Sequence, residues 1–95
     1  MFKITGYIKR EGEFDGHAYS KYAFEFIHNE NPNVVGWSTS YRGIRQLSVS
    51  ASKLKAVIGF DTPDAILNKD VNVSFAPGFG GKTVVDKIVI LGTSK

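Results

Sequence analysis

Residues 16–26 of this chain read GHAYSKYAFEF and hold four aromatic side chains. Successive side chains of an extended strand point to opposite faces of a sheet. The three rings at even positions therefore share one face: Tyr22, Phe24 and Phe26. Tyr19 falls on the other face, beside Lys21. The pattern predicts a strand over residues 18–28 with one ring face in a core. It leaves two roles open for Tyr19, a further core ring or a ring presented to a ligand.

Strand patterns recur along the rest of the chain and are separated by turn residues. We expect strands at residues 2–10, 34–41 with a continuation through 44–50, 70–75, and 83–91. In the first of these segments the apolar alternation predicts four inward positions: Phe2, Ile4, Gly6 and Ile8. Core roles are also expected for Phe75 and for the three rings of residues 18–28.

Two short helical segments are expected between the third and fourth strands. Residues 50–59 begin with a serine that can cap a helix and end at Gly59. In the next segment, Asp61 or Thr62 can act as N-cap before Pro63. Five strands with a helical element at this place match the OB-fold. The prediction is an all-β fold with one or two short helices, a five-stranded OB-fold-like barrel; an SH3-like barrel or a small sandwich competes with it.

Length and composition indicate a single domain, residues 1–95. The chain contains no cysteine, which excludes disulfides and thiolate metal sites and agrees with a reducing compartment. No apolar run reaches the roughly 20 residues of a membrane span, and the first residues lack the apolar core of a signal peptide. We therefore expect a cytoplasmic protein without membrane contact.

Basic side chains are concentrated in two segments of a chain whose net charge is +3. Residues 1–10 and 31–60 carry lysine and arginine but no acid. Clustered basic charge is typical of proteins that bind polyanions, although a solvated surface has the same composition. Charge alone leaves both interpretations open.

Residues 76–83, APGFGGKT, match a relaxed phosphate-loop pattern. The true motif has glycine at the first position and opens a helix, whereas Thr83 is followed by β-branched residues typical of a strand. We therefore interpret this segment as a glycine-rich hairpin loop. His17 and His28 have no third ligand at a recognisable spacing, and no nucleophile with a base is evident. No cofactor, metal or enzymatic activity is expected.

Aromatic and basic residues on the predicted polar faces favour single-stranded nucleic acid, because cations neutralise phosphates while bases stack on rings. The expected stacking residues are Tyr19 and Trp37, with Tyr7, Tyr41 or Phe79 as further members. The expected phosphate contacts are Lys9, Arg10, Lys21, Arg42, Arg45 and Lys82. Trp37, Thr39 and Tyr41 are predicted to share one strand face. Whether Trp37 and Phe79 face the core or a ligand stays open.

Two short motifs resemble the single-stranded DNA-binding proteins of filamentous phages, the gene V type, and related phage and plasmid OB-fold binders. Gly16, Tyr19 and Ser20 are similar to that family's Gly-x-x-Tyr-Ser, whose tyrosine belongs to a protruding DNA-contacting hairpin. Residues 79–91, FGGKTVVDKIVIL, are similar to its closing Phe-Gly followed by Asp, a basic residue and alternating aliphatics. The motifs cover less than a quarter of the chain, and residues 42–70 depart from the family pattern.

The resemblance implies a homodimer that coats single-stranded DNA cooperatively in a bacterial host cell, without cofactor or catalysis. The expected function is sequence-nonspecific binding and protection of single-stranded DNA during replication or transfer. Two alternatives remain. A protein–protein adaptor would use the same exposed rings, and an RNA-binding OB module would use the 2′-hydroxyl.

Overall fold

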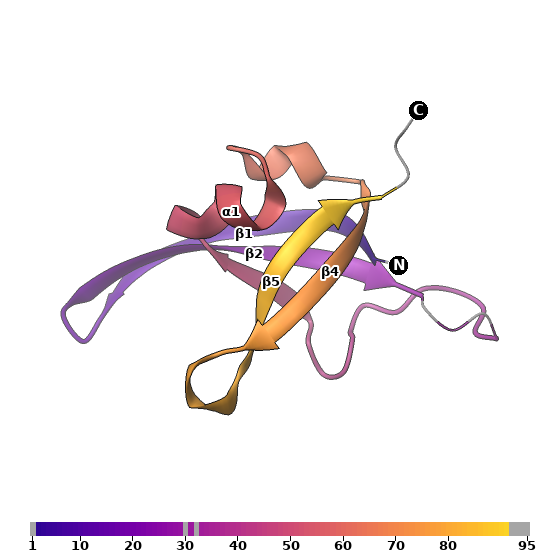
Figure 1. Ribbon diagram of the computed structural model, residues 1–95, viewed down its shortest axis with the longest axis horizontal. Helices are drawn as coiled ribbons and strands as arrows, with labels where there is room; N and C mark the ends of the chain where they lie inside the picture. Colours follow the sequence, from indigo (N-terminus) through magenta and orange to yellow (C-terminus); the bar gives the residue numbers. More distant parts are fainter. Residues whose placement is uncertain (1, 30, 32, 92–95) are drawn as a thin grey trace.

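The computed structural model describes residues 2–29, 31 and 33–91, and of Phe79 the backbone alone. Five antiparallel strands form one sheet in the order β3-β2-β1-β4-β5. Their bounds are β1 (Phe2–Phe14), β2 (His17–His28), β3 (Gln46–Ser50), β4 (Asp70–Pro77) and β5 (Thr83–Ile90). The helix α1 (Leu54–Ile58) lies between β3 and β4 (Figure 1). The predicted mostly-β fold with a short helix at this place is confirmed.

The sheet curves but does not close. Among the described residues no hydrogen-bonded ladder joins β3 to β5, which are the two edges of the sheet. The β1–β4 ladder contains only two residue pairs, Phe2 with Val71 and Lys3 with Asp70. A closed five-stranded barrel is therefore not confirmed, and a gap separates the two edge strands.

A β-bulge in β1 changes which side chains face the core. Ile4 pairs with Phe26 and Gly6 pairs with Glu25, so Thr5 is an extra residue without a partner on β2. One extra residue inverts the alternation of the strand beyond it. The prediction that Ile8 points inward is therefore wrong: Ile8 is 46% exposed, and Tyr7 packs against the core instead.

A second bulge lies at Asp86 in β5. Ser74 pairs with Lys87 and Phe75 pairs with Val85, which leaves Asp86 without a partner on β4. The bulge places this mid-strand carboxylate in solvent. The fully buried side chains around which the sheet curves are Phe2, Ile4, Phe24, Leu47, Ile66, Val71 and Ile88.

Residues 34–41 form a loop, so the third strand predicted there is wrong. The edge of β2 is already occupied by β3, which pairs with it from Lys21 to Glu25. The loop instead makes an isolated bridge from Ser38 to His28. The side-chain amide of Asn29 donates to the carbonyls of Val34 and Gly36, at 3.1 and 2.6 Å. Of the predicted continuation through residues 44–50, only Gln46–Ser50 is a strand.

The helical connection follows the predicted capping signals in part. Helix α1 ends at Gly59, whose φ of 83° is the left-handed conformation expected of a C-cap glycine. Ser50 makes no capping hydrogen bond. The second segment is a 3₁₀ turn, η2 (Pro63–Ile66), in which the Thr62 hydroxyl accepts a hydrogen bond from the Asp64 amide. Two further 3₁₀ turns, η1 (Ala51–Lys53) and η3 (Phe79–Gly81), complete the fold.

Candidate nucleic-acid interface

Two aromatic rings from distant parts of the sequence form the floor of a groove. Tyr41 precedes β3, and Phe75 lies in β4. Their ring centroids are 6.0 Å apart with 10° between the ring planes. Tyr41 also contacts Phe2 and His28 edge-on, at 5.1 and 5.2 Å, so its orientation is held from the core side. The groove encloses about 450 Å³ and is lined by Tyr41, Arg42, Ile44, Phe75, Lys82 and Thr83; we call it the aromatic groove.

Arg42 occupies a tight turn at one wall of the aromatic groove. Tyr41 and Ile44 exchange two backbone hydrogen bonds of 2.9 Å each. Between them, Arg42 and Gly43 have φ values of 53° and 83°. Two positive φ angles define a type I′ turn, in which Asn, Asp or Gly is strongly preferred at the first position. The arginine therefore occupies a position where its backbone conformation is unfavourable, and its guanidinium carbon lies 5.1 Å from the Tyr41 ring centroid.

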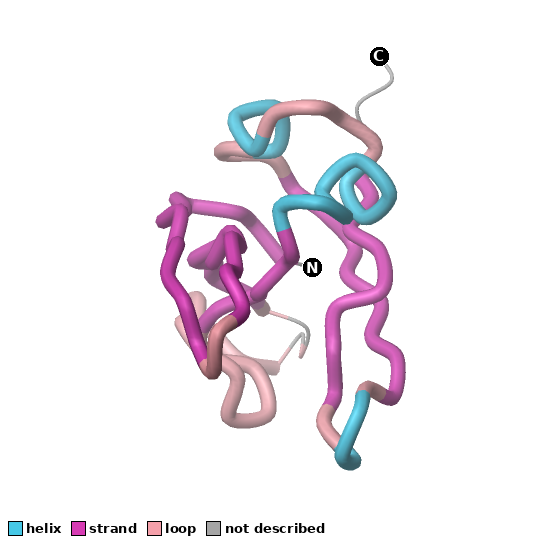
Figure 2. Tube along the Cα trace, turned by 90° about the vertical axis from the view of Figure 1, so that its left-hand side faces the viewer, coloured by secondary structure: helices cyan, strands magenta, loops and turns pink. Residues whose placement is uncertain are grey.

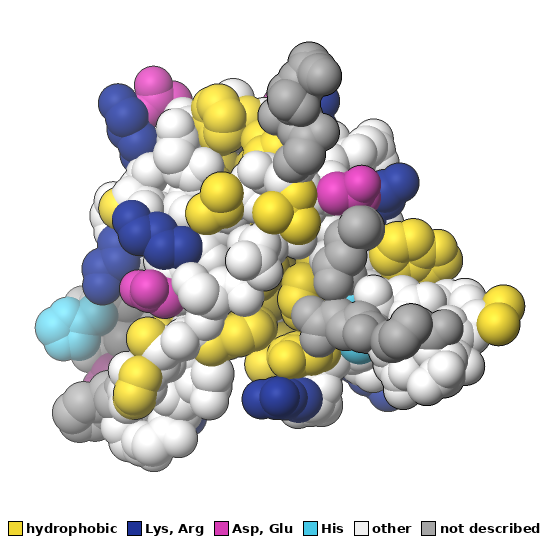
Figure 3. All heavy atoms as spheres, turned by 45° about the vertical axis from the view of Figure 1, so that its right-hand side comes forward, with side chains coloured by type: hydrophobic (Ala, Val, Ile, Leu, Met, Phe, Trp, Pro, Cys, Tyr) yellow, Lys and Arg dark blue, Asp and Glu magenta, His cyan; other side chains and the backbone are white. Residues whose placement is uncertain are grey.

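Lys82, in the loop between β4 and β5, also lines the aromatic groove. Figures 1 and 2 show this loop and the turn before β3 extending from the same side of the sheet, away from α1. In Figure 3 hydrophobic side chains are visible in the hollow between the two lower lobes, with a basic side chain below them. The lining of the aromatic groove thus combines two rings with two cations, which is the composition that holds single-stranded nucleic acid.

A second ring-and-cation surface lies on the outer face of the β1–β2 hairpin, which Figure 1 shows extending beyond the rest of the sheet. Tyr19 pairs with Gly12, and its ring covers this glycine so closely that a Cβ there would lie 2.7 Å from the hydroxyl. Arg10 pairs with Lys21 on the same face. We call Arg10, Gly12, Tyr19 and Lys21 the hairpin face. Tyr19 is 46% exposed, and the prediction that it lies opposite the core rings, with Lys21, is confirmed.

The acids near Tyr19 point away from it. Glu11 pairs with Ser20 and Glu13 pairs with Ala18, and directly opposed residues share a face, so both carboxylates lie on the other side of the hairpin. Glu11 forms an ion pair with Lys9 at 3.7 Å on that side. The alternation of the strands therefore separates the basic side chains of the hairpin face from these two acids.

Tyr7 and Lys9 lie on the core side of the sheet, and their predicted place on its polar face is wrong. The bulge at Thr5 turns both inward, and Lys9 lies 5.8 Å from the centroid of the Tyr22 ring. The Tyr7 hydroxyl donates a 2.7 Å hydrogen bond to the Asp64 carboxylate. This bond stabilises the protonated phenol and raises the pKa of Tyr7 above its usual value.

Three further predicted residues have separate positions. Trp37 is 52% exposed in the loop before β3 and shares no strand face with Tyr41, so the predicted common face is wrong. Arg45 directly precedes β3 and lines a pocket there with Glu25 and Gln46. Phe79 lies in the β4–β5 loop, and its side chain is outside the described part of the structure.

Sequence reasoning missed the contribution of Phe75 to this interface. Phe75 was expected in the core, and it does pack against the core with one part of its surface. Its other part lines the aromatic groove. The sequence carries no signal for this double role, because the role depends on the bulge at Asp86 and on the position of the turn before β3.

No protein-family model, curated protein or solved structure matches this chain. Within residues 2–29, 31 and 33–91, no three His, Asp or Glu side chains gather as metal ligands would. Over the same described ranges, no helix has the length and apolarity needed to cross a membrane.

Proposed function

We propose that this protein binds single-stranded DNA without strong sequence preference and coats it during replication or transfer. The observation that carries the proposal is the aromatic groove, where the stacked Tyr41 and Phe75 rings share one lining with Arg42 and Lys82. Bases can stack on rings whatever their identity, and exposed cations neutralise the phosphates on either side. Unpaired bases are required for this mode, which favours single strands over duplexes.

The hairpin face supplies a second contact surface for the same strand. Tyr19 stacks a base, and Arg10 and Lys21 neutralise phosphates. OB-fold proteins bind nucleic acid over strands 2 and 3 and the loops between strands 1 and 2 and between strands 4 and 5. The sheet order and the positions of Tyr19 and Lys82 agree with that arrangement, and we propose an OB-type fold with an open β3–β5 edge. The likeness of two short motifs to gene V-type proteins points in the same direction.

The direct test is a titration of fluorescently labelled oligo-dT, followed by anisotropy at several salt concentrations, with Trp37 emission as a second signal. We expect saturable binding whose affinity falls with salt by a slope of about −0.7 per neutralised phosphate, or about −3.5 if the five cations take part. These cations are Arg10, Lys21, Arg42, Arg45 and Lys82. A duplex of equal length should bind less tightly. Absence of saturable, salt-dependent binding would falsify the proposal, and stronger binding of oligo-U would redirect it to RNA.

We further propose a homodimer formed through β5. This strand is an edge of the sheet, and it exposes 45% of Val84 and 54% of Val89. Exposed apolar edges are favourable sites for association with a second chain. Sedimentation should show a dimer that Val89→Lys converts to a monomer. A monomeric wild type at micromolar concentration would exclude it.

A protein–protein adaptor is the second candidate function, favoured by the apolar tip of the loop before β3. Val34, Val35 and Trp37 are 52%, 100% and 52% exposed there. A partner bound at this tip should show a shallow salt dependence, and Val35→Ser should weaken it without changing oligo-dT affinity. A Val35→Ser variant that loses oligo-dT affinity would instead assign the tip to the nucleic-acid interface.

A further inference from the structure

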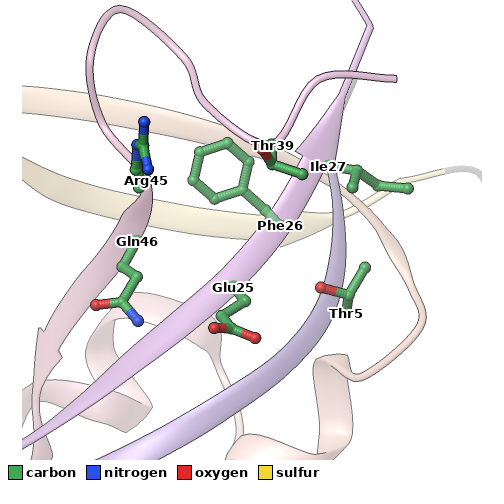
Figure 4. Close-up of a pocket in the computed structure, with 7 residues that line it drawn as sticks. All are labelled: Thr5, Glu25, Phe26, Ile27, Thr39, Arg45 and Gln46. Carbon is green, nitrogen blue, oxygen red and sulfur yellow. The ribbon is translucent and has the colours of Figure 1, made fainter. Parts of the chain in front are cut away.

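A carboxylate and a guanidinium line one pocket where β3 begins, near the proposed nucleic-acid path. Glu25 lies in β2 and Arg45 directly precedes β3. The pocket has a volume of about 480 Å³, within the usual range for small-molecule sites. Its lining residues are Thr5, Glu25, Phe26, Ile27, Thr39, Arg45 and Gln46 (Figure 4).

The two charged groups in this pocket are not paired with each other. Among the described residues, neither Glu25 nor Arg45 forms an ion pair or a side-chain hydrogen bond. Figure 4 shows the Glu25 carboxylate between the side chains of Gln46 and Thr5, with Arg45 at another end of the pocket. The carboxylate also lies over Gly6, where a Cβ would be 3.8 Å from Oε1. The pocket therefore offers an acceptor-only group and a donor-only group to one ligand.

This pocket is linked to the aromatic groove through shared lining residues. Gln46 lines it and also lines the gap between the edge strands β3 and β5. That gap in turn shares Ile44, Phe75 and Thr83 with the aromatic groove. A strand whose bases stack on Tyr41 and Phe75 can therefore place a neighbouring base in the pocket by passing around the edge of β3.

We propose that the Glu25–Arg45 pocket reads the edges of one base and prefers guanine, an inference that rests on the proposed nucleic-acid binding. Guanine carries two adjacent donors, N1–H and the N2 amino group, which match the two oxygens of a carboxylate. It also carries the O6 and N7 acceptors, which match the arginine fork. Adenine and cytosine present one donor group beside an acceptor that would face the carboxylate, and thymine presents a single donor between two carbonyls. The protein thus binds single strands of any sequence, and the contact with guanine fixes its position along the strand.

The test compares oligo-dT with the same oligonucleotide carrying one central dG, dA, dC, inosine or 7-deazaguanine. We expect the dG oligonucleotide to bind about five- to tenfold more tightly than oligo-dT, the low end of what one bidentate base contact gives. Inosine lacks the N2 amino group and 7-deazaguanine lacks N7, so each should lose most of this gain. Competition with dGMP shows whether the pocket binds a base within a strand or a free mononucleotide.

Glu25→Gln should abolish the preference for dG and leave oligo-dT affinity unchanged or slightly higher. Glu13→Gln is the matched control, because it removes an exposed acid from the other face of the hairpin. Arg45→Lys keeps the charge and should lose the sensitivity to 7-deazaguanine. If all the substituted oligonucleotides bind with equal affinity, the guanine site is overturned but the proposed binding of single-stranded DNA is not. If no oligonucleotide binds, both the guanine site and the proposed binding of single-stranded DNA are overturned. If dGMP nevertheless binds and Glu25→Gln abolishes that binding, the pocket is a mononucleotide site instead.

Discussion

The ring of Tyr41 lies nearly parallel to the ring of Phe75, with 10° between their planes, although the two residues are 34 positions apart in the sequence. Each ring contacts the core with one part and the aromatic groove with another. A ring supported in this way is held in place before a base arrives, so stacking requires little further ordering. This relationship motivates the first prediction.

Phe75→Leu should weaken oligo-dT binding by about 1–3 kcal/mol, the usual value of one base–ring stack. Leucine keeps most of the apolar volume, so the free energy of unfolding should fall by less than about 1.5 kcal/mol. Tyr22→Leu is the control, because that half-buried ring lies on the core face outside the aromatic groove. Anisotropy titrations and urea unfolding measure the two effects. Equal loss of binding in both variants would contradict a specific role of the groove.

Arg42→Asn should separate the cation from the turn that carries it. Asn-Gly is a preferred type I′ turn sequence, so the substitution should leave the free energy of unfolding unchanged or raise it. The lost phosphate contact should lower the magnitude of the salt slope by about 0.7. Lys53→Gln, which removes an exposed cation from the helical side, is the control. An unchanged slope in Arg42→Asn would show that Arg42 contacts no phosphate.

Tyr19→Ala should weaken oligo-dT binding while the fold persists, since Tyr19 is 46% exposed and its ring lies over Gly12, which has no side chain, on the opposite strand. Circular dichroism and thermal unfolding check the fold, and anisotropy measures the affinity. Phe60→Ala removes an aromatic ring of similar exposure, 43%, after α1, and should leave the affinity unchanged. Unfolding of Tyr19→Ala would instead identify Tyr19 as a structural ring of the hairpin.

The hydrogen bond from Tyr7 to Asp64 should make stability depend on alkaline pH. The folded state raises the pKa of Tyr7, mainly through this hydrogen bond to the carboxylate. Its stabilisation is therefore fully present below the unfolded tyrosine pKa of about 10 and is lost as the pH rises through the higher folded value. Tyr7→Phe should be less stable than wild type at neutral pH, and the difference should shrink above the folded pKa.

Urea unfolding at a series of pH values from neutral to strongly alkaline measures this dependence. Asp64→Asn keeps a carbonyl acceptor but removes the negative charge, so it should keep part of the stability at neutral pH and lower the pH at which Tyr7 ionises. A constant stability difference between wild type and Tyr7→Phe across the whole series would contradict the assignment.

The alternation of residues 16–26 was sufficient to predict which side chains of β2 face the core and which lie on the opposite face. Phe24 and Phe26 are buried and Tyr22 packs on the core, whereas Tyr19 lies with Lys21 on the opposite face. The same reasoning failed in β1, because a β-bulge adds one residue to the strand and the apolar pattern of the sequence does not reveal it. Ile8 was expected inward and Tyr7 outward, and Thr5 exchanges the two.

The loop before β3 shows a second limit of prediction from the sequence. Residues 34–41 contain β-branched and aromatic side chains typical of a strand, and propensity alone predicts one. A strand needs a partner with free backbone groups, and the edge of β2 is taken by residues 46–50. Which of two candidate segments pairs with an edge is decided by competition across the whole fold.

By itself the sequence determined the local properties of this protein: four of the five extended segments, a short helical connection ended by Gly59, the face of Tyr19 and the basic surplus. These follow from side-chain periodicity, backbone conformation and charge, which act over a few neighbouring residues. Only the tertiary structure decided that Tyr41 stacks on Phe75 in one groove with Arg42 and Lys82, and that Glu25 and Arg45 line one pocket. Such contacts join strands and loops far apart in the chain, and their partners are set by sheet order, by two bulges and by an edge left open.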